Sequence, residues 1–576
     1  MGGYIFSPRP PRSSCSKRSR PVSRLNRSGP AAHLVAVTPT TWLRVVLGLW
    51  PLLAGAQTQK FATQFRADAP EVPAAVRAPA VAPPWTGAEA GPVAGLREFA
   101  RERSGAIWLG NDAGAARFDP TATHRWDRWQ YFAGRRWLAD DAVQAIVVDE
   151  RAPPKTVWVR TRSGVARWEW RPLTLAQKAQ AFEDRIDARH VRHGMVGSTR
   201  LHVAGDLSTS VTHDNDNDGL WTAMYLGAEA FRFAATKEPA ARVRARRSLD
   251  LLMRLEEITG IPGFPARSFV SVTEPKPKDG EWHPTADGRW LWKGDTSSDE
   301  MVGHYYAYAR YYDLVADEAE KVAIRRVVAR ITDHLIRNDY NLVDLDGQPT
   351  RWGVWGEAYF QTEEGKYEAP LRCLELLSFL KTAHHLTGDA KYAAAYDDRV
   401  RRGYAEQMRH YRRWPGGGEI NFSDDELAYL SYDPLLRYER EPKLRAIYVE
   451  GLAFTWQQIQ PDLNPLWNFI SAASGAGPLT PALRDDARRT LERIPVDLIS
   501  WTVKNAHRRD LTRHTDRDRF EKPQLTAVLA PDERPIAKWN ANPYVPDGGA
   551  GGTSEDDGAF FLLPYWMGRY HGWIQD

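Results

Sequence analysis

The pattern of apolar and polar positions changes once along this 576-residue chain, near residue 174. From there to residue 576 it has the helical period, with apolar residues three and four positions apart. Twelve such amphipathic runs begin near Leu175, Asp218, Ala240, Asp299, Asp317, Pro370, Asp389, Asp424, Glu441, Pro465, Pro481 and Asp557. The sequence therefore predicts a mainly α domain over residues 174–576.

The links between these runs alternate in length. Only a few residues separate the second run from the third, the fourth from the fifth, the sixth from the seventh and the eighth from the ninth. Longer links rich in Gly, Pro, Trp, Asp and Asn precede the second, fourth, sixth and twelfth runs. About twelve helices joined in this way fit an (α/α)6 toroid, in which six apolar inner helices form a ring inside six outer ones. The alternative, an open α-solenoid, would show a repeating period, which the sequence lacks.

Ahead of residue 174 the pattern is that of short strands. Residues 107–119 align with residues 157–169, and each segment reads as a strand, a turn with Gly and a second strand that ends near an aromatic residue. This weak repeat resembles a hairpin of the two-component-regulator propeller repeat, but two units cannot close a propeller, which needs about four blades. We therefore expect a small β domain over residues 94–172, with two unrelated hairpins as the alternative.

The first 93 residues have the features of an export signal and a linker. Residues 1–56 hold eight basic residues and no acidic one, followed by an interrupted apolar run and Ala54-Gly55-Ala56. A basic stretch, a short apolar run and a small-x-small site are typical of a signal peptide. We therefore expect a periplasmic or extracellular protein; the alternative is a disordered basic tail beside a short apolar helix. Residues 57–93, rich in Ala, Pro and Val, read as a linker.

Charge and cysteine content exclude several classes of partner and site. The chain has 77 Lys and Arg against 73 Asp and Glu, but residues 57–576 hold 69 against 73, a net charge of −4. Because this part has no basic excess, we expect no nucleic-acid partner. No later segment approaches ~18 uninterrupted apolar residues, so we expect no integral membrane contact. Of the two cysteines, Cys15 lies in the signal peptide, which leaves Cys373 without a disulfide partner or a cysteine metal site.

Carboxylate and amide side chains cluster where several predicted inner helices begin. The clusters occupy residues 213–221, 293–300, 421–426, 464–468 and 554–558. Helix capping and the helix dipole account for one or two such groups at each start, whereas these clusters supply three or four. Because the N-termini of inner helices would meet at one end of a toroid, we expect the clusters to line one funnel.

Three of these carboxylates also match the opening of a calcium loop. Asp214, Asp216 and Asp218 alternate as the first ligands of such a loop do. The twelfth position should be Glu and is Tyr225, so the bidentate ligand is missing. We expect no metal cofactor, with calcium at Asp214, Asp216 and Asp218 as the alternative.

The predicted architecture and its acidic funnel resemble the (α/α)6-toroid carbohydrate-active enzymes, the glycoside hydrolases and polysaccharide lyases of that fold. The resemblance covers residues 174–576 and implies a carbohydrate substrate. Glycoside hydrolysis usually needs one protonated carboxylic acid and one carboxylate. We predict Asp299 or Glu300 as the general acid and Asp424 or Asp425 as the base that directs water. Toroid hydrolases are commonly inverting, which implies a separation of about 6.5 to 9.5 Å between the two carboxyl groups.

The remaining candidates would bind the sugar. Asp216 and Asp218 would bind hydroxyls or take one of the two catalytic roles. Trp side chains, of which the chain has 23, can stack on sugar rings, and we expect this of Trp221, Trp352 and Trp467. Further substrate-binding candidates are His304, Arg351, Trp355, Asn421, Asn468, Trp539, Asn540 and Asp557.

Two other functions stay open at this point. A polysaccharide lyase acting on a uronate-containing glycan would need a Tyr or His base beside a neutralised carboxyl. The residues that could supply this are His304, Tyr305, Tyr306, Arg351 and Asn421. A non-catalytic glycan-binding or sensor protein would use the aromatic residues and need few acids. Because acids outnumber cations in the clusters, the sequence favours an exported glycoside hydrolase.

Overall fold

The computed structural model of the chain describes residues 61–69, 71, 91–93, 97–409, 411, 421–518, 520–536 and 538–575. The predicted signal peptide, residues 1–56, and most of the predicted linker lie outside these residues. In the described part no helix is both long enough and apolar enough to cross a bilayer.

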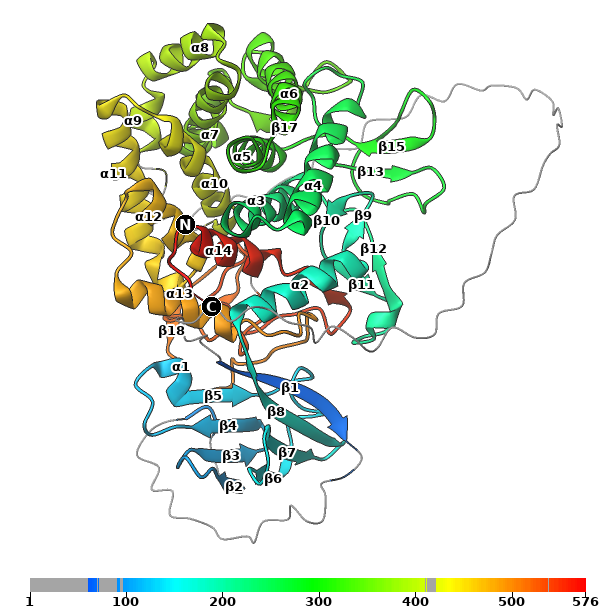
Figure 1. Ribbon diagram of the computed structural model, residues 1–576, viewed down its shortest axis with the longest axis vertical. Helices are drawn as coiled ribbons and strands as arrows, with labels where there is room; N and C mark the ends of the chain where they lie inside the picture. The colour runs from blue at the N-terminus through cyan, green and yellow to red at the C-terminus, as the bar shows by residue number, and fades with distance from the viewer. Residues whose placement is uncertain are drawn as a thin grey trace, which may run out of the picture. The chain divides into compact units, whose positions relative to one another are not determined.

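Two four-stranded antiparallel sheets form the N-terminal β domain (Figure 1). One has the strand order β2-β3-β4-β5 and the other β1-β8-β7-β6. The strands are β1 Phe61–Ala69, β2 Glu98–Arg101, β3 Ile107–Asn111, β4 Gly114–Phe118, β5 Trp129–Phe132, β6 Val143–Asp149, β7 Lys155–Thr161 and β8 Val165–Leu173, with the short helix α1 Arg125–Arg128 before β5. The two aligned segments are hairpins, β3–β4 in one sheet and β7–β8 in the other.

The linker prediction is wrong for residues 61–69. Strand β1 pairs with β8 over its whole length, from Phe61 opposite Leu173 to Ala69 opposite Val165. The segment precedes a Pro-rich stretch, and its few polar residues hid the extended pattern. The core of the domain contains Trp108 and Trp168, both fully buried, with the ring of Phe132 stacked 4.6 Å from that of Trp168.

From residue 174 the described chain is mainly helical, as predicted. One set of helices has one buried and one exposed face: α2 Leu175–Arg189, α4 Pro239–Glu257, α6 Glu318–Arg337, α8 Ala390–Arg401, α11 Pro442–Ile459 and α13 Pro481–Arg493. The other set is buried over most of its length: α3 Asp218–Thr236, α5 Ser298–Leu314, α7 Glu363–Thr387, α10 Phe422–Tyr438, α12 Pro465–Ser474 and α14 Ala559–Tyr570. A short helix, α9 Tyr404–Met408, was not predicted.

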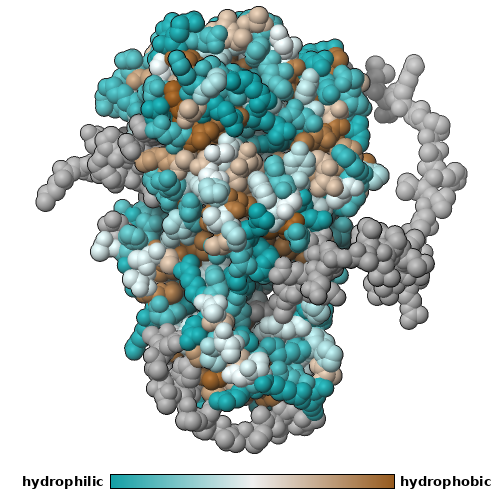
Figure 2. Space-filling model, turned by 60° about the vertical axis from the view of Figure 1, so that its left-hand side comes forward, coloured by the Kyte–Doolittle hydropathy of each residue, from teal (hydrophilic) through white to brown (hydrophobic). Residues whose placement is uncertain are grey.

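The buried set forms a closed circuit of contacts. Helix α3 packs on α5, α5 on α7, α7 on α10, α10 on α12, α12 on α14, and α14 returns to α3. Figure 1 shows this set lying inside the amphipathic one. Among the described residues, exposed large apolar side chains are scattered, and Figure 2 shows mostly hydrophilic residues on one face of the surface. The apolar faces of the helices are therefore turned inward.

One predicted start is displaced. Helix α7 begins at Glu363, about two turns before Pro370, which lies inside the helix. Its first residues, Glu363 to Lys366, are polar and give no apolar period. Thr362 caps this start by accepting the backbone N–H of Gly365 at 2.9 Å.

The long loops precede the buried helices and carry short strands. These strands are β9 Val191–Arg192, β10 Met195–Val196, β11 Thr199–Leu201, β12 Ser210–Thr212, β13 Ser268–Ser271, β14 Trp282–Pro284, β15 Trp290–Lys293, β16 Asn341–Val343, β17 Pro349–Val354, β18 Arg513–Arg517, β19 Pro523–Leu525 and β20 Ser554–Glu555. Hydrogen bonds join successive loops, for example from Thr350 Oγ1 to the carbonyl of Thr296 at 2.8 Å. The loop before α14 also contacts the β domain, where the backbone N–H of Tyr131 donates to Glu533 at 3.0 Å.

Candidate functional site

The starts of neighbouring buried helices are held together by polar contacts. The Asn217 amide, at the start of α3, donates to Asp299, in the first turn of α5, at 3.2 Å. Lys538 lies 3.3 Å from both Asp556 and Asp557, just before α14, and its ammonium group is 5.0 Å from the centre of the Trp221 ring on α3. These contacts bring three of the five predicted clusters to one end of the circuit.

Asp299 and Glu300 differ sharply in their surroundings. Asp299 is half-buried and accepts hydrogen bonds from Asn217 and from the Ser297 hydroxyl, 3.0 Å away. Glu300 is fully buried; one oxygen lies 2.7 Å from the Ser297 hydroxyl oxygen, and the other has no hydrogen-bond partner among the described residues. Burial raises the pKa of Glu300 to about 8, and the charge of Asp299 adds to this effect while Arg267 opposes it.

His304 lies one turn after Glu300 on the same face of α5, and it too is fully buried. Its Nδ1 is 3.1 Å from the Tyr308 hydroxyl, and its Nε2 has no partner among the described residues. Burial lowers the pKa of His304 to about 3. The imidazole is therefore neutral at pH 7, and the prediction that it binds substrate stays a prediction.

Two buried carboxyl groups face the same region and were not predicted. Glu375 on α7 and Glu426 on α10 are each 1% exposed or less. Burial raises the pKa of Glu375 to about 7 and that of Glu426 well above its usual range, and the charge of Asp299 raises both. The charge of Asp299 on α5 thus reaches carboxyl groups on α7 and α10. The three helices therefore bring these acids close together.

Glu426 has the fewest polar contacts of these buried acids. The structure shows no hydrogen bond and no ion pair to its side chain from the described residues, and its Oε1 is buried without a partner. The charge of Lys538 is the one opposing influence on its pKa. Glu426 directly follows Asp424 and Asp425 in a predicted cluster, but the sequence predicts the catalytic role for one of the two aspartates.

Asp424, Asp425 and Asn421 lie in the first turn of α10, next to Glu426. Asn421 caps the helix by accepting the backbone N–H of Ser423, and its amide donates to Asp424 at 2.6 Å. Burial and the nearby carboxylates raise the pKa of Asp424 well above its usual range. Asp425 is buried and accepts from the Tyr411 hydroxyl at 2.6 Å. Their predicted role as base is untested.

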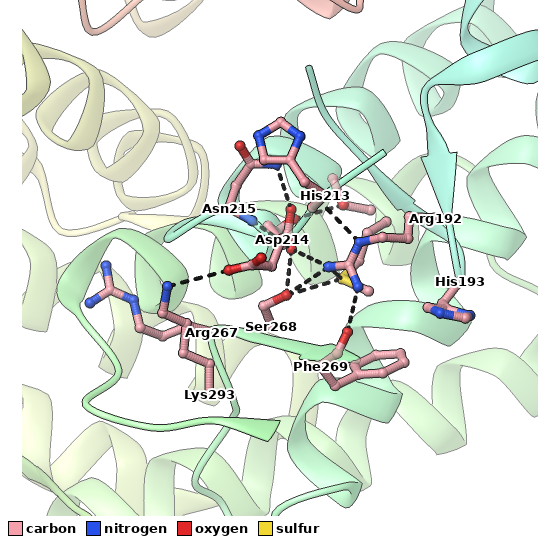
Figure 3. A network of polar contacts seen from close by, with 12 residues as sticks. Arg192, His193, His213, Asp214, Asn215, Arg267, Ser268, Phe269 and Lys293 are labelled. Carbon is pink, nitrogen blue, oxygen red and sulfur yellow. Dashed lines mark hydrogen bonds and ion pairs between the residues drawn. The ribbon is translucent and has the colours of Figure 1, made fainter. Parts of the chain in front are cut away.

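The cluster before α3 is organised by cations (Figure 3). Asp218 is buried, accepts from Arg192 at 2.8 Å and from Ser268 at 2.5 Å, and thereby fixes strand β13 to the start of α3. Asp216 is exposed and pairs with Lys293 at 2.5 Å. Asn215 also donates to both carboxylate oxygens of Asp218, so each oxygen already has a hydrogen-bond partner. The geometry therefore gives Asp218 a structural role and disfavours the catalytic one.

The same contacts bear on the calcium alternative. The Lys293 ammonium group stands 3.6 Å from Asp214 and 2.5 Å from Asp216, where a bound cation would have to be, while Asp218 turns to Arg192. No group of three His, Cys, Asp or Glu side chains among the described residues is arranged to hold a metal ion. The three carboxylates are therefore engaged by protein cations, and calcium at this loop stays the alternative.

The predicted aromatic and amide residues divide between core and cavity. Trp355 is fully buried and donates its indole N–H to Glu375 at 2.7 Å, so it orients that acid, and its predicted contact with substrate is not supported by the geometry. Trp352 is half-buried beneath the exposed Arg351, whose guanidinium is 4.4 Å from its ring centre. Asn468 is buried and accepts from Trp456 at 2.9 Å. Asn540 lies half-buried in the turn after Trp539.

A cavity of about 670 Å³ opens at this end of the circuit. It lies between the starts of α10, α12 and α14, the end of α13 and residues 531–536 and 538–543. Trp467 and Trp539, two predicted substrate-binding residues, line it together with Phe422 and Phe560. Phe422 is one turn before Glu426 and shares its face of α10. Lys538 also lines the cavity, so the cavity adjoins the carboxyl groups.

Comparison with known proteins gives weak structural similarities only. No family model matches the chain. No curated protein matches it either. A metagenome-derived glycoside hydrolase family 9 endoglucanase has a TM-score of 0.39 and 12% identity, covering 82% of this chain and 100% of that one. A thermostable endoglucanase from Alicyclobacillus acidocaldarius has a TM-score of 0.38 and 11% identity, covering 82% of this chain and 98% of that one. A sugar epimerase from a ruminal bacterium has a TM-score of 0.36 and 9% identity, covering 70% of this chain and 99% of that one.

At these TM-scores and identities the similarities support no statement about the chemistry of this chain. The residues suggested for a lyase can be judged from their own positions. Tyr305 is buried, and its hydroxyl lies 2.7 Å from that of Thr332 on α6, while Asn421 caps α10 and Arg351 is exposed on strand β17. The described contacts do not join them into one group.

Proposed function

We propose that the protein is an exported glycoside hydrolase built on an (α/α)6 toroid, with Glu426 as the general acid and Asp299 as the base. The toroid is supported by the closed circuit from α3 to α14 and by the six amphipathic helices packed outside it. This arrangement brings the acids of separate helices to one end of the ring.

The observation that carries the proposal is the isolation of Glu426. A general acid must hold a proton at neutral pH and donate it to the leaving oxygen. Burial, together with the charge of Asp299, raises the pKa of Glu426 well above the ordinary value, and none of the described residues accepts a hydrogen bond from it. A carboxylic acid in this state can protonate a glycosidic oxygen placed between it and the cavity.

Asp299 suits the second role because it is half-buried and held by two donors. Asn217 and Ser297 orient its carboxylate, which can then accept a proton from an attacking water molecule. Glu300, with one unpartnered oxygen beside it, adds a further protonated carboxyl group. A base that acts on water, and not on the sugar directly, gives inversion at the anomeric carbon.

The test compares Glu426→Gln and Asp299→Asn with the wild type on a panel of oligo- and polysaccharides. New reducing ends are measured together with ultraviolet absorbance, and the first anomer released is identified by NMR. Loss of a general acid or base costs roughly 10²–10⁴-fold in rate, so both variants should lose at least a hundredfold. Glu363→Gln is the matched control, because this carboxylate stands at the start of α7 but is 91% exposed.

Each other outcome overturns a defined part of the proposal. Full activity in Glu426→Gln removes the assigned acid, and loss in Asp425→Asn alone returns the roles to the neighbouring aspartates. An unsaturated product that absorbs in the ultraviolet replaces hydrolysis by elimination. Binding of glycans without any product identifies a glycan-binding protein.

A further inference from the structure

The cavity beside Glu426 contains a buried arginine that has no ion-pair partner among the described residues. Arg534 lines the cavity and is 9% exposed. No carboxylate of the described residues lies within ion-pair distance of its guanidinium group, which donates one long hydrogen bond of 3.5 Å to the Pro543 carbonyl. Burial lowers the pKa of Arg534 to about 10, and the charge of Asp462 offsets this only in part.

Two buried arginines of the same region are paired with carboxylates, whereas Arg136, like Arg534, donates to backbone carbonyls. Arg493 lies 2.8 Å from Asp532, and Arg508 lies 3.0 Å from Glu533. Burying a charge without a partner is costly, because the solvation that water supplied is not replaced. The fold thus accepts at Arg534 a cost that it avoids at Arg493 and Arg508.

The other cation of the cavity is already neutralised. Lys538 stands 3.3 Å from both Asp556 and Asp557, which raise its pKa against the effect of burial. Among the described residues the one carboxylate on the cavity wall, Asp462, accepts from the Tyr544 hydroxyl at 2.7 Å and lies beyond ion-pair distance of Arg534. Arg534 therefore remains without an ion pair, and its guanidinium group matches a ligand group with a single negative charge. The indole N–H of Trp539, which is buried without an acceptor among the described residues, supplies a further donor on the cavity wall.

The walls of the cavity fix the rest of the ligand. Trp467, Trp539, Phe422 and Phe560 present aromatic surface, which stacks on the apolar face of a sugar ring. Polar side chains interrupt this aromatic surface at Arg534 and Lys538, as is usual in a site that orients a small ligand. A sugar ring that carries a carboxylate satisfies both the aromatic surface and the cation.

We propose that this cavity binds a uronic acid residue of the substrate, with its carboxylate on Arg534 and its ring against the tryptophans. The identification of the ligand as a sugar rests on the proposed function. The cavity adjoins Glu426 through Phe422 and Lys538, so the uronic acid would occupy a position next to the bond that is cleaved.

The test measures binding, not turnover, by calorimetry on the whole protein. The probes are D-glucuronic acid, its neutral methyl ester, D-glucose and acetate. We expect D-glucuronic acid to bind roughly ten- to a hundredfold more tightly than its ester or glucose, the range for a charge-assisted hydrogen-bonded contact, and acetate to bind far more weakly. Because the ester comparison uses the wild-type protein, it does not depend on the folding of any variant.

Variants then locate the contact. Arg534→Gln should bind D-glucuronic acid no better than its ester, and Arg534→Lys should keep part of the preference. Arg484→Gln, which removes an exposed arginine from α13, is the matched control and should behave as wild type. Equal binding of acid and ester by the wild type, or an unchanged preference in Arg534→Gln, overturns the inference.

These results are separate from those for the proposed function. If D-glucuronic acid binds as expected but Glu426→Gln still cleaves at the wild-type rate, the uronic acid site stands and the catalytic assignment fails. If neutral glycans are cleaved through Glu426 while the acid and its ester bind equally, the reverse holds. Acetate binding as tightly as D-glucuronic acid overturns the assignment to a sugar and leaves a site for small carboxylates.

Discussion

Replacing Glu300 by Gln should stabilise the protein at neutral pH. Glu300 is fully buried and its folded pKa is about 8, against 4.5 for an ordinary glutamate. Below pH 4.5 the group is protonated in both folded and unfolded states, so it has no effect there. As the pH rises above 4.5 the unfolded state releases the proton and the folded state retains it, which destabilises the folded state by about 1.4 kcal/mol per pH unit.

At pH 7 this cost amounts to about 3 kcal/mol, and it becomes constant above pH 8. Gln has nearly the same shape, carries no proton to release, and keeps an oxygen that can accept from Ser297. We therefore expect Glu300→Gln to be more stable than wild type by up to about 3 kcal/mol at pH 7 and by little near pH 4.5.

The assay is urea unfolding followed by tryptophan fluorescence at intervals from pH 4.5 to 8.5. The quantity of interest is the difference in the free energy of unfolding between Glu300→Gln and wild type, which should widen with pH. Glu363→Gln, at an exposed site, should follow the wild-type curve closely. Parallel curves for Glu300→Gln and wild type, or a variant that is less stable at pH 7, would refute the reasoning.

Two further predictions concern carboxylates that have cationic partners. Asp218→Ala removes the 2.8 Å ion pair of the buried Arg192 and should lower the free energy of unfolding by about 3–5 kcal/mol. Asp216→Ala removes an exposed carboxylate from Lys293, which keeps Asp279 and Asp214 as partners, and should cost less than about 1 kcal/mol. Equal urea midpoints for the two variants would contradict this. In the β domain, Arg117 overcomes burial and lowers the pKa of Glu102 to about 2, so its stabilisation is present above pH 4.5 and is lost as the pH falls towards 2. Glu102→Gln should be less stable at pH 7 by about 1–3 kcal/mol, and the difference should close on acidification; a difference that is constant from pH 7 to 2 would show that the charge is not involved.

Helical periodicity and link length were enough to predict the order of the helices. Eleven of the twelve predicted starts lie within a few residues of an observed helix start, because each run combines an apolar stripe with a capping residue or proline. The exception, α7, begins with a polar turn, so its apolar period starts late. Strand β1 was missed because its neighbours in sequence are rich in Ala and Pro, while its partner β8 lies about a hundred residues away.

The candidate site was predictable in position but not in detail. Charged clusters at helix starts identify the end of the domain where the acids meet. Which carboxylate is engaged depends on partners from distant loops: Arg192 and Ser268 on Asp218, Lys293 on Asp216, Trp355 on Glu375. These partners lie 20 to 77 positions away, and no local pattern contains them.

Hydrogen-bond and ion-pair partners also distinguish helix capping from catalysis, the two explanations that the sequence left open for each acid. A capping carboxylate accepts backbone N–H groups at the start of its helix. In α10 the capping side chain is Asn421, so Glu426 does not cap the helix. The helix dipole would favour an ionised Glu426, yet burial and the charge of Asp299 raise its pKa well above the usual range. A carboxyl group that neither caps the helix nor pairs with a cation, but is kept protonated in the interior of the ring, has no structural use that would offset its burial. That cost is understandable where a proton must be held ready for a substrate.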